Sequence, residues 1–474
     1  LEFPTEVIRE LETINEEMTE NDAKDRQDLR DLPTITIDPV SAKDYDDAIG
    51  YIATDSNIKL YVHIADVSHY VKPELKLFEE AVKRGNSYYF PKMVIPMLPE
   101  KLSNKVCSLR PDEDKLTMTV ETIFDSDFNI IRQKAYQSII KSDARFSYDE
   151  IDDLFEGKKN EIKPELAEML RNMLALSREL DKKRIKRGYI KLNLPETEFI
   201  FNDEGIVIDL KRSNETESHV LIENFMLLAN EFVAQKLSDK PTLYRIHEYP
   251  DEEKILSLQE ILSNYKLTLT DLNDLHHSLQ KVLAEMKEEN YHRVFDKIIL
   301  RSFRKARYST ENPGHFGLAM DTYTHFTSPI RRICDLIVHL QLKDRLTGKP
   351  DRFSRGELEN YAGKASECEK IADESEREVE IKNKLLFMKK QIGEEFTGII
   401  VGVQPSSLLV ELDSLPVSGR VELSTLKDDY YEYFEKHQEI VGKRYGKIYK
   451  LTDPVRVMIS KIDDDIYLNI LKNK

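Results

Sequence analysis

The sequence predicts a mixed α/β protein of several domains, in which a sheet with surrounding helices is followed by a C-terminal β-barrel. Three observations carry this prediction. The chain has 474 residues, more than a single domain usually holds. Strand-like segments occur early, and helical periodicity begins near residue 163. Residues 394–474 return to short strands that are separated by turn residues.

The expected strands of the sheet lie in the first third of the chain. Residues 58–71 (IKLYVHIADVSHYV) and 116–125 (LTMTVETIFD) alternate in polarity or are rich in β-branched residues, as strands are. The segment 34–50 (TITIDPVSAKDYDDAIG) has an acidic loop between apolar flanks. We therefore expect this loop to lie among the strands.

Two helices are expected at about 163–186 and 218–237. In the second helix, one apolar stripe, typical of a core-facing side, is formed by Leu221, Phe225, Leu228 and Phe232. Glu223 stands beside this stripe, where an acid is uncommon unless it is paired or functional. A solvated helix edge is the ordinary alternative for Glu223.

The C-terminal part begins with the charged stretch 355–393, which reads as one long helix or a helix pair. Segments 394–426 and 453–471 then indicate short strands of a small β-barrel. The predicted organisation is a lead-in segment (1–33), a main domain (34–354), a helical connector that is part of the main domain (355–393) and the barrel (394–474).

The net charge of −17 argues against a protein that coats nucleic acid through overall basicity. Any such binding needs a local cluster of cations. Two candidate clusters exist: Arg301, Arg304, Lys305 and Arg307 in one, and Arg331 and Arg332 in the other. Taken alone, the first cluster is more typical of a solvated helix face.

Cysteine usage and hydropathy favour a soluble cytoplasmic protein. Cys107, Cys334 and Cys368 lie far apart without a CxxC pair, which suggests neither a disulfide framework nor a zinc site. The chain has no apolar run of about 18 residues, and its first residues are acidic rather than leader-like.

The loop within residues 34–50 gathers four aspartates: Asp38, Asp44, Asp46 and Asp47. Clustered carboxylates raise each other's pKa and cost stability unless a cation lies among them. An EF-hand starting at Asp44 would need an oxygen ligand at Ala48 and glycine at Ile49, so that motif is excluded. A hard ion such as Mg²⁺ fits better, and an acid-rich solvated turn is the alternative.

Five longer segments resemble, in order and spacing, the signature blocks of the RNB exoribonuclease family, to which ribonucleases II and R belong. They are 36–48 (TIDPVSAKDYDDA), 63–73 (HIADVSHYVKP), 89–109 (YFPKMVIPMLPEKLSNKVCSL), 245–251 (RIHEYPD) and 314–339 (GHFGLAMDTYTHFTSPIRRICDLIVH). The last eighty or so residues resemble the S1-type OB-fold that ends these enzymes.

The resemblance implies a Mg²⁺-dependent enzyme of RNA decay and processing that hydrolyses single-stranded RNA from the 3′ end to nucleoside 5′-monophosphates. We expect a monomer that acts on RNA 3′ ends and does not bind membranes. Two alternatives stay open: a catalytically idle RNA-binding scaffold of the same fold and a two-metal DNA exonuclease. The four aspartates and Arg331 argue against the first, and Tyr148 with Glu223 argue against the second.

The resemblance also assigns roles to single residues. Asp38, Asp44 and Asp47 would hold one or two Mg²⁺ ions, for which Mn²⁺ can substitute, and Asp46 would be critical in the chemical step. Arg331 would grip the terminal phosphates with support from Arg332. Tyr89 would stack on the 3′-terminal base, and Tyr148 and Glu223 would contact the ribose 2′-hydroxyl. We expect His315 and His325 to give hydrogen-bonding support.

Three departures from the family pattern are visible. Members usually begin with two cold-shock domains, whereas LEFPTEVIREL at the start of this chain resembles the segment that follows them. A second base-clamping aromatic is replaced by Leu192. In the barrel, Leu408 and Leu409 stand where the family has an aromatic platform, so we expect weaker RNA contact there, based on backbone charge.

Overall fold

The computed structural model describes residues 2–54, 56–286 and 288–471, which divide into two units. The first unit consists of the chain up to Arg187, Thr216–Glu248 and Ala306–Glu374. The second consists of Gly188–Glu215, Tyr249–Lys305 and the chain from Ser375 onward. The chain thus leaves and re-enters each unit.

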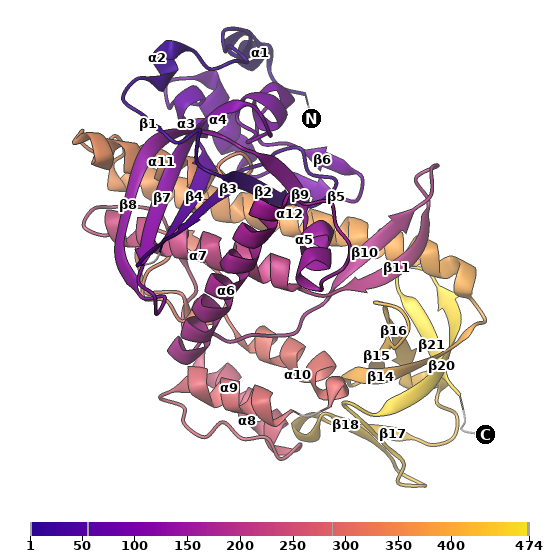
Figure 1. The fold of residues 1–474 in the computed structure, drawn as a ribbon. Helices are drawn as coiled ribbons and strands as arrows, with labels where there is room; N and C mark the ends of the chain where they lie inside the picture. The colour runs from indigo at the N-terminus through magenta and orange to yellow at the C-terminus, as the bar shows by residue number, and fades with distance from the viewer. Residues whose placement is uncertain (1, 55, 287, 472–474) are drawn as a thin grey trace. The chain divides into compact units, whose positions relative to one another are not determined.

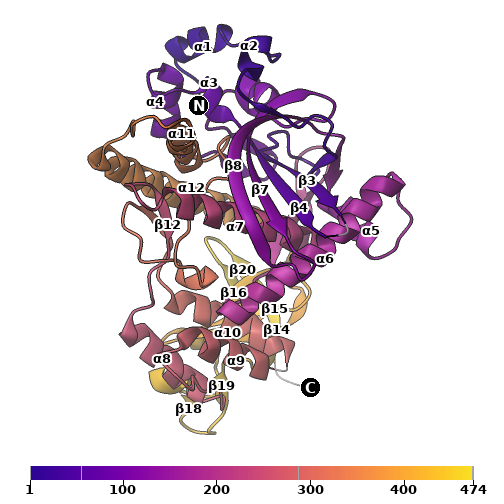
Figure 2. The ribbon, with the colours of Figure 1, turned by 60° about the vertical axis from the view of Figure 1, so that its left-hand side comes forward.

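A seven-stranded sheet lies at the centre of the first unit (Figure 1). Its strands, in spatial order, are β1 (Gln27–Asp28), β8 (Ile130–Lys141), β7 (Asp114–Phe124), β4 (Ile58–Ala65), β3 (Asp47–Ala53), β2 (Thr34–Asp38) and β9 (Ala144–Ser147). Pairing is antiparallel from β8 to β2, and the edge strands β1 and β9 pair in parallel with β8 and β2. Figure 2 shows β3, β4, β7 and β8 side by side.

The central strands are rich in Ile, Val, Thr and Tyr, the residues that suit a pleated surface. Most residues of β4 and β7 are buried, including Leu60, Ile64 and Met118, which are fully inaccessible. The polar side chains of β7 that alternate with the apolar ones are buried too, among them Thr117, Thr119 and Glu121, so both faces of this strand are covered.

Helices surround this sheet. They are α1 (Thr5–Glu12), α2 (Glu20–Ala23), α3 (Val67–Tyr70), α4 (Lys76–Arg84), α5 (Tyr148–Phe155), α6 (Pro164–Arg187), α7 (Glu217–Leu237) and α11 (Ile333–Thr347). Helices α6 and α7 pack on each other, and they contact β3 and β4 respectively. Phe124, Phe225 and Phe326 are fully buried in the resulting core. A hairpin pairs β5 (Tyr88–Phe90) with β6 (Met93–Ile95), and a second two-stranded sheet pairs β12 (Tyr244–Ile246) with β13 (Arg307–Ser309), which is distant in the sequence.

The strand predicted for residues 58–71 is too long. Strand β4 ends at Ala65, and α3 begins at Val67. Asp66 causes the break, because its fully buried carboxylate accepts a hydrogen bond from the Ser68 hydroxyl at 2.7 Å and pairs with Arg26 at 2.6 Å. Such local side-chain bonds compete with a strand ladder.

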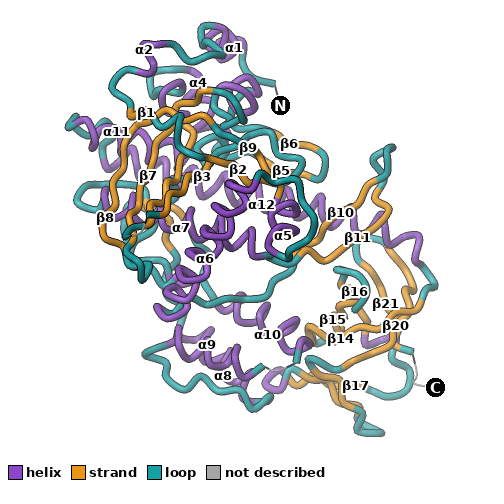
Figure 3. Tube along the Cα trace, in the orientation of Figure 1, coloured by secondary structure: helices purple, strands orange, loops and turns teal. Residues whose placement is uncertain are grey.

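The second unit contains the C-terminal barrel. Its closed sheet consists, in order, of β14 (Glu395–Gln404), β15 (Ser407–Leu412), β16 (Ser418–Glu422), β21 (Ile466–Ile470) and β20 (Pro454–Ile462). A three-stranded sheet follows β16, made of β17 (Tyr431–Phe434), β18 (Glu439–Gly442) and β19 (Ile448–Lys450). The unit also holds the hairpin of β10 (Glu196–Phe201) and β11 (Val207–Ser213) and the helices α8 (Glu252–Ser263), α9 (Leu275–Glu285) and α10 (Glu289–Ser302). Figure 3 shows these three helices joined by loops.

One helix, α12 (Arg355–Met388), settles whether the stretch 355–393 is one helix or two. It ends in a short 3₁₀ turn, Lys389–Gln391. Leu358, Ala362 and Ala365 on its first half belong to the core of the first unit. The sheet with surrounding helices and the closed C-terminal barrel confirm the predicted fold class. Within the described ranges, no helix has the length and apolar character that crossing a membrane requires.

Candidate active site

A pocket of about 450 Å³ in the first unit brings together the nine residues to which the sequence assigns metal, phosphate, base or ribose contacts, whereas His315 does not line it. Its wall comes from the β2–β3 loop, β5, the start of α5, one side of α7 and the segment 323–332. The predicted site residues on this wall are Asp38, Asp44, Asp46, Asp47, Tyr89, Tyr148, Glu223, Arg331 and Arg332. The structure thus gathers residues from five parts of the sequence in one cavity.

The four aspartates owe their closeness to strand pairing. Asp38 is the last residue of β2, where it pairs with Ser147 of β9. Asp47 is the first residue of β3 and pairs with Ile64 of β4. Because β2 and β3 are neighbours, the loop between them holds its acids at one end of the sheet.

The electrostatics of this loop are unfavourable for so many negative charges. Burial raises the pKa of Asp38 to about 8, and repulsion by Asp47 adds to the rise. Burial also raises the pKa of Asp47 to about 6, although Arg331 and Arg332 oppose this. The pKa of Asp46 is likewise well above its ordinary value because the carboxyl is buried. A bound cation would relieve this repulsion.

Asp46 links the acidic loop to the distant TSPIRR segment. Its Oδ1 accepts a hydrogen bond from the backbone N–H of Ile330 at 2.8 Å, and its Oδ2 lies 3.7 Å from Nε of Arg331. Its backbone carbonyl accepts the N–H of Ala65 at 2.8 Å. The carboxylate is therefore held in place from two sides.

The two arginines are fixed differently. Arg332 donates from Nε and Nη2 to the fully buried Asp335, each at 2.8 Å, a bidentate contact. Asp335 also accepts the N–H of Ser328 at 2.7 Å. Arg331 keeps 44% of its side chain exposed and donates to Ser328 Oγ at 3.1 Å. Arg331 is thus the arginine that can reach a ligand, while Arg332 is tied to the protein.

Two tyrosines from different elements line the pocket. Tyr89 on β5 is 37% exposed, and its hydroxyl donates to Asp44 Oδ2 at 2.7 Å. Tyr148 is the first residue of α5, where Ser147 and Glu150 form a capping box. Its ring stacks on His219 with centroids 3.9 Å apart. Both rings therefore have a defined orientation at the pocket.

Glu223 proves to be a paired acid rather than an isolated one on a solvated helix edge. It lies on α7, lines the pocket and forms an ion pair with Arg184 of α6, with 3.0 Å between Oε1 and Nη2. Sequence reasoning missed Arg184, because nothing in the local pattern of residues 163–186 marks one buried arginine among several exposed cations.

The donor set of the pocket fits a hard divalent cation. No three His, Cys, Asp or Glu side chains in the described ranges form a ready-made ligand set. The buried atoms Asp38 Oδ2 and Asp46 Oδ2 nevertheless lack a hydrogen-bond donor. Mg²⁺ commonly takes only one or two protein carboxylates and completes its shell with water and substrate phosphate. A carboxylate oxygen without a donor, such as Oδ2 of Asp38, is the kind of ligand that such an ion needs.

Several wall residues were missed by sequence reasoning. Asn230 accepts the N–H of Phe326 at 2.8 Å and donates to the Tyr323 hydroxyl at 3.0 Å. Its position, seven residues after Glu223 on the same helix, was a usable signal because that spacing returns to one face. His325, by contrast, was expected to give hydrogen-bonding support. It lines the pocket, and its Nδ1 shares a hydrogen bond with the Tyr308 hydroxyl at 2.8 Å.

The basic cluster 301–309 does not form the expected helix face. Helix α10 ends at Ser302, and Arg307 begins β13. Arg304 pairs with Asp251, and Arg307 pairs with Glu248 at 3.5 Å. Arg304 and Arg307 therefore lie outside the helix and form ion pairs with the segment 248–251.

Arg301 instead lines a second pocket, of about 380 Å³, within the second unit. Lys254 of α8 shares this pocket, and β14 with Leu409 of β15 forms its barrel side. Its described lining residues include two cations and no carboxylate. Leu408 points into the barrel core, where it is fully buried.

Comparison with known proteins shows which family has this sequence. The RNB domain family model matches residues 26–348, and the S1 RNA binding domain model matches residues 389–470. Ribonuclease R of Aquifex aeolicus is 42% identical over 471 residues, which covers 98% of this chain and 67% of the relative. Ribonuclease R of Thermotoga maritima is 39% identical over 476 residues, with the same two coverages of 98% and 67%.

A solved structure of a relative has a similar fold. Mycoplasma genitalium RNase R in complex with ribose methylated single-stranded RNA superposes with a TM-score of 0.93 at 31% identity. The match covers 99% of this chain and 76% of that one. The chain therefore spans about two thirds of the length of the two curated relatives and three quarters of the solved one.

Proposed function

The chain belongs to the RNB family of 3′-to-5′ exoribonucleases, and on this premise we propose that its aspartate-lined pocket hydrolyses single-stranded RNA to nucleoside 5′-monophosphates with Mg²⁺ as cofactor. One observation carries the proposal. Nine residues with the chemistry for phosphate, base and ribose contact line a single cavity, although they are spread over residues 38–332 of the sequence.

Asp38, Asp44 and Asp47 would hold one or two divalent ions, and Mn²⁺ would substitute for Mg²⁺. When bound, the cation supplies Lewis-acid activation of water and neutralises charge on the scissile phosphate. Of these carboxylates, Asp38 has a buried Oδ2 without a hydrogen-bond donor, and Asp44 accepts the Tyr89 hydroxyl through Oδ2.

Asp46 would act in the chemical step. Its Oδ1 is occupied by the N–H of Ile330, whereas the buried Oδ2 has no hydrogen-bond donor. That oxygen can accept a hydrogen bond from the attacking water and orient it. Because the carboxylate is fixed in advance, no reorganisation is needed at the moment of reaction.

Arg331 would grip the phosphates at the 3′ end. A guanidinium is a rigid, permanently charged fork that matches phosphate oxygens. Its 3.7 Å approach to Asp46 puts the phosphate site next to the acid of the chemical step. Arg332, held by two bonds to Asp335, would support the turn that carries Arg331.

Base and ribose contacts complete the substrate site. Tyr89 would stack on the 3′-terminal base. Any nucleotide can make this contact, because every base has a π-face. Tyr148 and Glu223 would contact the ribose 2′-hydroxyl, the group that distinguishes RNA from DNA. These contacts make RNA 3′ ends the expected substrate.

The S1 barrel would add RNA affinity through phosphate charge. Its Leu409 offers no stacking platform, but Lys254 and Arg301 lie across the same pocket. Phosphate contacts of this kind position a nucleic acid without reading its sequence.

The two alternatives from the sequence find no support among the named relatives, which are ribonucleases R. For the cellular setting we propose RNA decay and processing in the cytoplasm by a monomer. A cysteine usage typical of reducing compartments supports this location.

Product analysis tests the proposed function. RNA labelled at the 5′ end and bearing a single-stranded 3′ tail is incubated with Mg²⁺, and a parallel reaction contains a chelator. We expect a ladder that shortens from the 3′ end, release of nucleoside 5′-monophosphates and no reaction with chelator. Internal cleavage products, or equal degradation without a divalent ion, would contradict the proposal.

A further inference from the structure

Three ion pairs join α6 to α7. They are Arg178 with Glu217 at 2.6 Å, Arg184 with Glu223 at 3.0 Å and Arg187 with Glu231 at 2.8 Å. The first and last arginines keep 57% and 39% of their side chains exposed, whereas Arg184 keeps 7%. Of these three pairs, the middle one alone includes a residue of the pocket wall.

Arg184 is fixed by more than this ion pair. Its Nη1 donates to Oδ1 of Asn224, the residue next to Glu223 on α7. Asn224 in turn donates from Nδ2 to the carbonyl and the hydroxyl of Ser177, at 3.1 Å and 3.0 Å. A buried guanidinium is tolerated only when it is paired in this way. The planar fork therefore has one stable position between the helices.

This arrangement determines where the Glu223 carboxylate lies. A glutamate side chain has several rotatable bonds and on a partly open surface samples several rotamers. Here Nη2 of Arg184 holds Oε1 at 3.0 Å while the residue lines the pocket. A hydrogen bond to a hydroxyl depends steeply on direction, so an acceptor that reads a sugar must be held in place.

We propose that Arg184 is a positioning residue for sugar recognition: it holds the Glu223 carboxylate where the pocket receives a ribose that bears a 2′-hydroxyl. The inference rests on the proposed function, in which Glu223 contacts the ribose. A site built to hydrogen-bond a substrate hydroxyl rejects the analogue that lacks it. Removal of the Arg184 guanidinium should therefore lower the preference for RNA and not merely lower the rate.

The test compares the ratio of kcat/KM for RNA and for substrates with a single 2′-deoxynucleotide at each of the last four 3′ positions. The variants are Arg184→Met, which keeps length without charge, and Arg184→Lys, which keeps charge without the fork. Arg187→Met is the matched control, because it breaks an ion pair of similar length between the same two helices outside the pocket. The same variants are also made in a Glu223→Ala background.

We expect Arg184→Met to lower the RNA preference by about tenfold or more, the scale of one misplaced charge-assisted hydrogen bond. The value of kcat/KM for RNA should fall. The value for the substrate whose 2′-deoxynucleotide occupies the position that Glu223 contacts should change little. Arg184→Lys should recover part of the preference, and Arg187→Met should leave it unchanged. In the Glu223→Ala background, Arg184→Met should cause no further loss, as expected for two residues that act as one unit.

Unchanged preference in Arg184→Met, or an equal loss in Arg187→Met, would overturn the inference while leaving the proposed function intact. Should Arg184→Met fail to fold, Arg184→Lys decides the matter. The inference is overturned if Arg184→Lys keeps the full RNA preference of the wild type. It is also overturned if Arg184→Lys lowers the RNA preference as much in the Glu223→Ala background as in the wild type. Wild-type protein that degrades RNA and DNA alike would overturn the ribose contact itself, and this inference with it.

Discussion

Buried aspartates in this chain fall into two groups. Asp66 and Asp335 are almost inaccessible, yet each has cations in direct contact: Arg26 and Lys343 in one case, and Arg332 in the other. Asp38 and Asp46 each keep one buried oxygen without a hydrogen-bond donor, and the pKa of both is raised. The tightly paired acids stabilise the fold, whereas Asp46 has only the more distant Arg331 at 3.7 Å, and we propose that Asp38 and Asp46 belong to the reaction centre.

Asp66 allows a test of the first group. Burial alone would raise the pKa of Asp66, but Lys343 and Arg26 hold it well below the usual range. Replacement of Asp66 by Asn leaves two buried cations without their counter-charge. We expect the free energy of unfolding at neutral pH to fall by about 3–5 kcal/mol, the usual cost of breaking a buried pair. Chemical denaturation measures it.

The pH dependence has a definite sign. Because the pKa of Asp66 is lowered on folding, its stabilisation is present above the pKa of an unfolded aspartate, about 3.9. It is lost as the pH falls below that value, so the stability of Asp66→Asn should depend less on pH in acid. Asp114→Asn serves as control, because its partner Arg30 is 41% exposed and such pairs contribute about 1 kcal/mol at most. Equal losses in both variants would refute this reading.

At the level of helices and strands, the sequence pattern located α6 and α7 to within one residue at each end and missed where β4 and α10 end. Long periodic segments such as α7 and the strands of the barrel were predicted. The ends at Ala65 and Ser302 were not, because they depend on contacts with Arg26 and Asp251, which are far away in the sequence. Local periodicity contains no information about such partners.

The candidate site shows the same division. The nine predicted contact residues were found by resemblance, and all nine line one pocket. Arg184 and Asp335 were missed as supports, because a residue that acts by holding another one is recognised only when the contact is seen. Only their contacts in the folded protein, with Glu223 and with Arg332, point to these roles.

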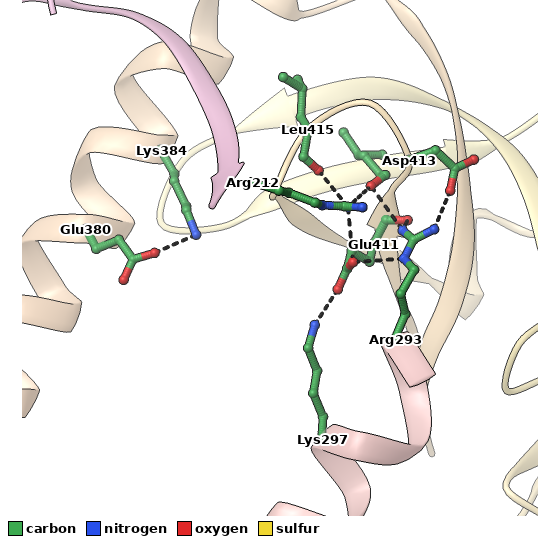
Figure 4. A network of polar contacts seen from close by, with 9 residues as sticks. Arg212, Arg293, Lys297, Glu380, Lys384, Glu411, Asp413 and Leu415 are labelled. Carbon is green, nitrogen blue, oxygen red and sulfur yellow. Dashed lines mark hydrogen bonds and ion pairs between the residues drawn. The ribbon is translucent and has the colours of Figure 1, made fainter. Parts of the chain in front are cut away.

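A polar network joins the barrel to its neighbours in the second unit (Figure 4). Glu411 of β15, only 6% exposed, faces Arg212 of β11 and both Arg293 and Lys297 of α10. Arg293 also pairs with Asp413 at 2.7 Å. Burial alone would raise the pKa of Glu411, but the three cations, above all Lys297, lower it. The barrel is therefore tied to α10 and to the β10–β11 hairpin.

Glu411→Gln should loosen this connection. We expect hydrogen exchange in β15, α10 and β11 to become about tenfold faster or more, because a partly buried pair with three cations is broken. Glu380→Gln is the control, since it removes a partly exposed i,i+4 pair with Lys384 in α12, and such pairs contribute about 0.3–0.5 kcal/mol. Unchanged protection in Glu411→Gln would show that the ion pairs of Glu411 do not hold the barrel in place.

Considered as a whole, the molecule must bind a polyanion despite a net charge of −17. Its cations therefore have to act locally. Many of them are used in ion pairs, as Arg304 and Arg307 are. Lys254 and Arg301, by contrast, line a pocket without a carboxylate among its described lining residues.

Lys254→Ala combined with Arg301→Ala should weaken binding of long RNA about equally for all sequences. The slope of log affinity against log salt concentration should become shallower by about 2, or about 1 for each phosphate that a cation no longer neutralises. Fluorescence anisotropy over a salt series measures both quantities. Arg304→Ala is the control, because its guanidinium already pairs with Asp251. An unchanged slope in the double variant would show that RNA does not contact this pocket.

The central claim is that the aspartate pocket carries out RNA hydrolysis, and Asp46→Asn tests it most directly. The substitution keeps size and removes one charge at a group that is 4% exposed and held by the N–H of Ile330. Single-turnover cleavage and equilibrium binding are measured on one labelled RNA oligonucleotide with Mg²⁺. We predict a cleavage rate at least about a hundredfold lower, on the scale of one electrostatic stabiliser, with affinity near that of the wild type. Cleavage by Asp46→Asn at the wild-type rate would contradict the account.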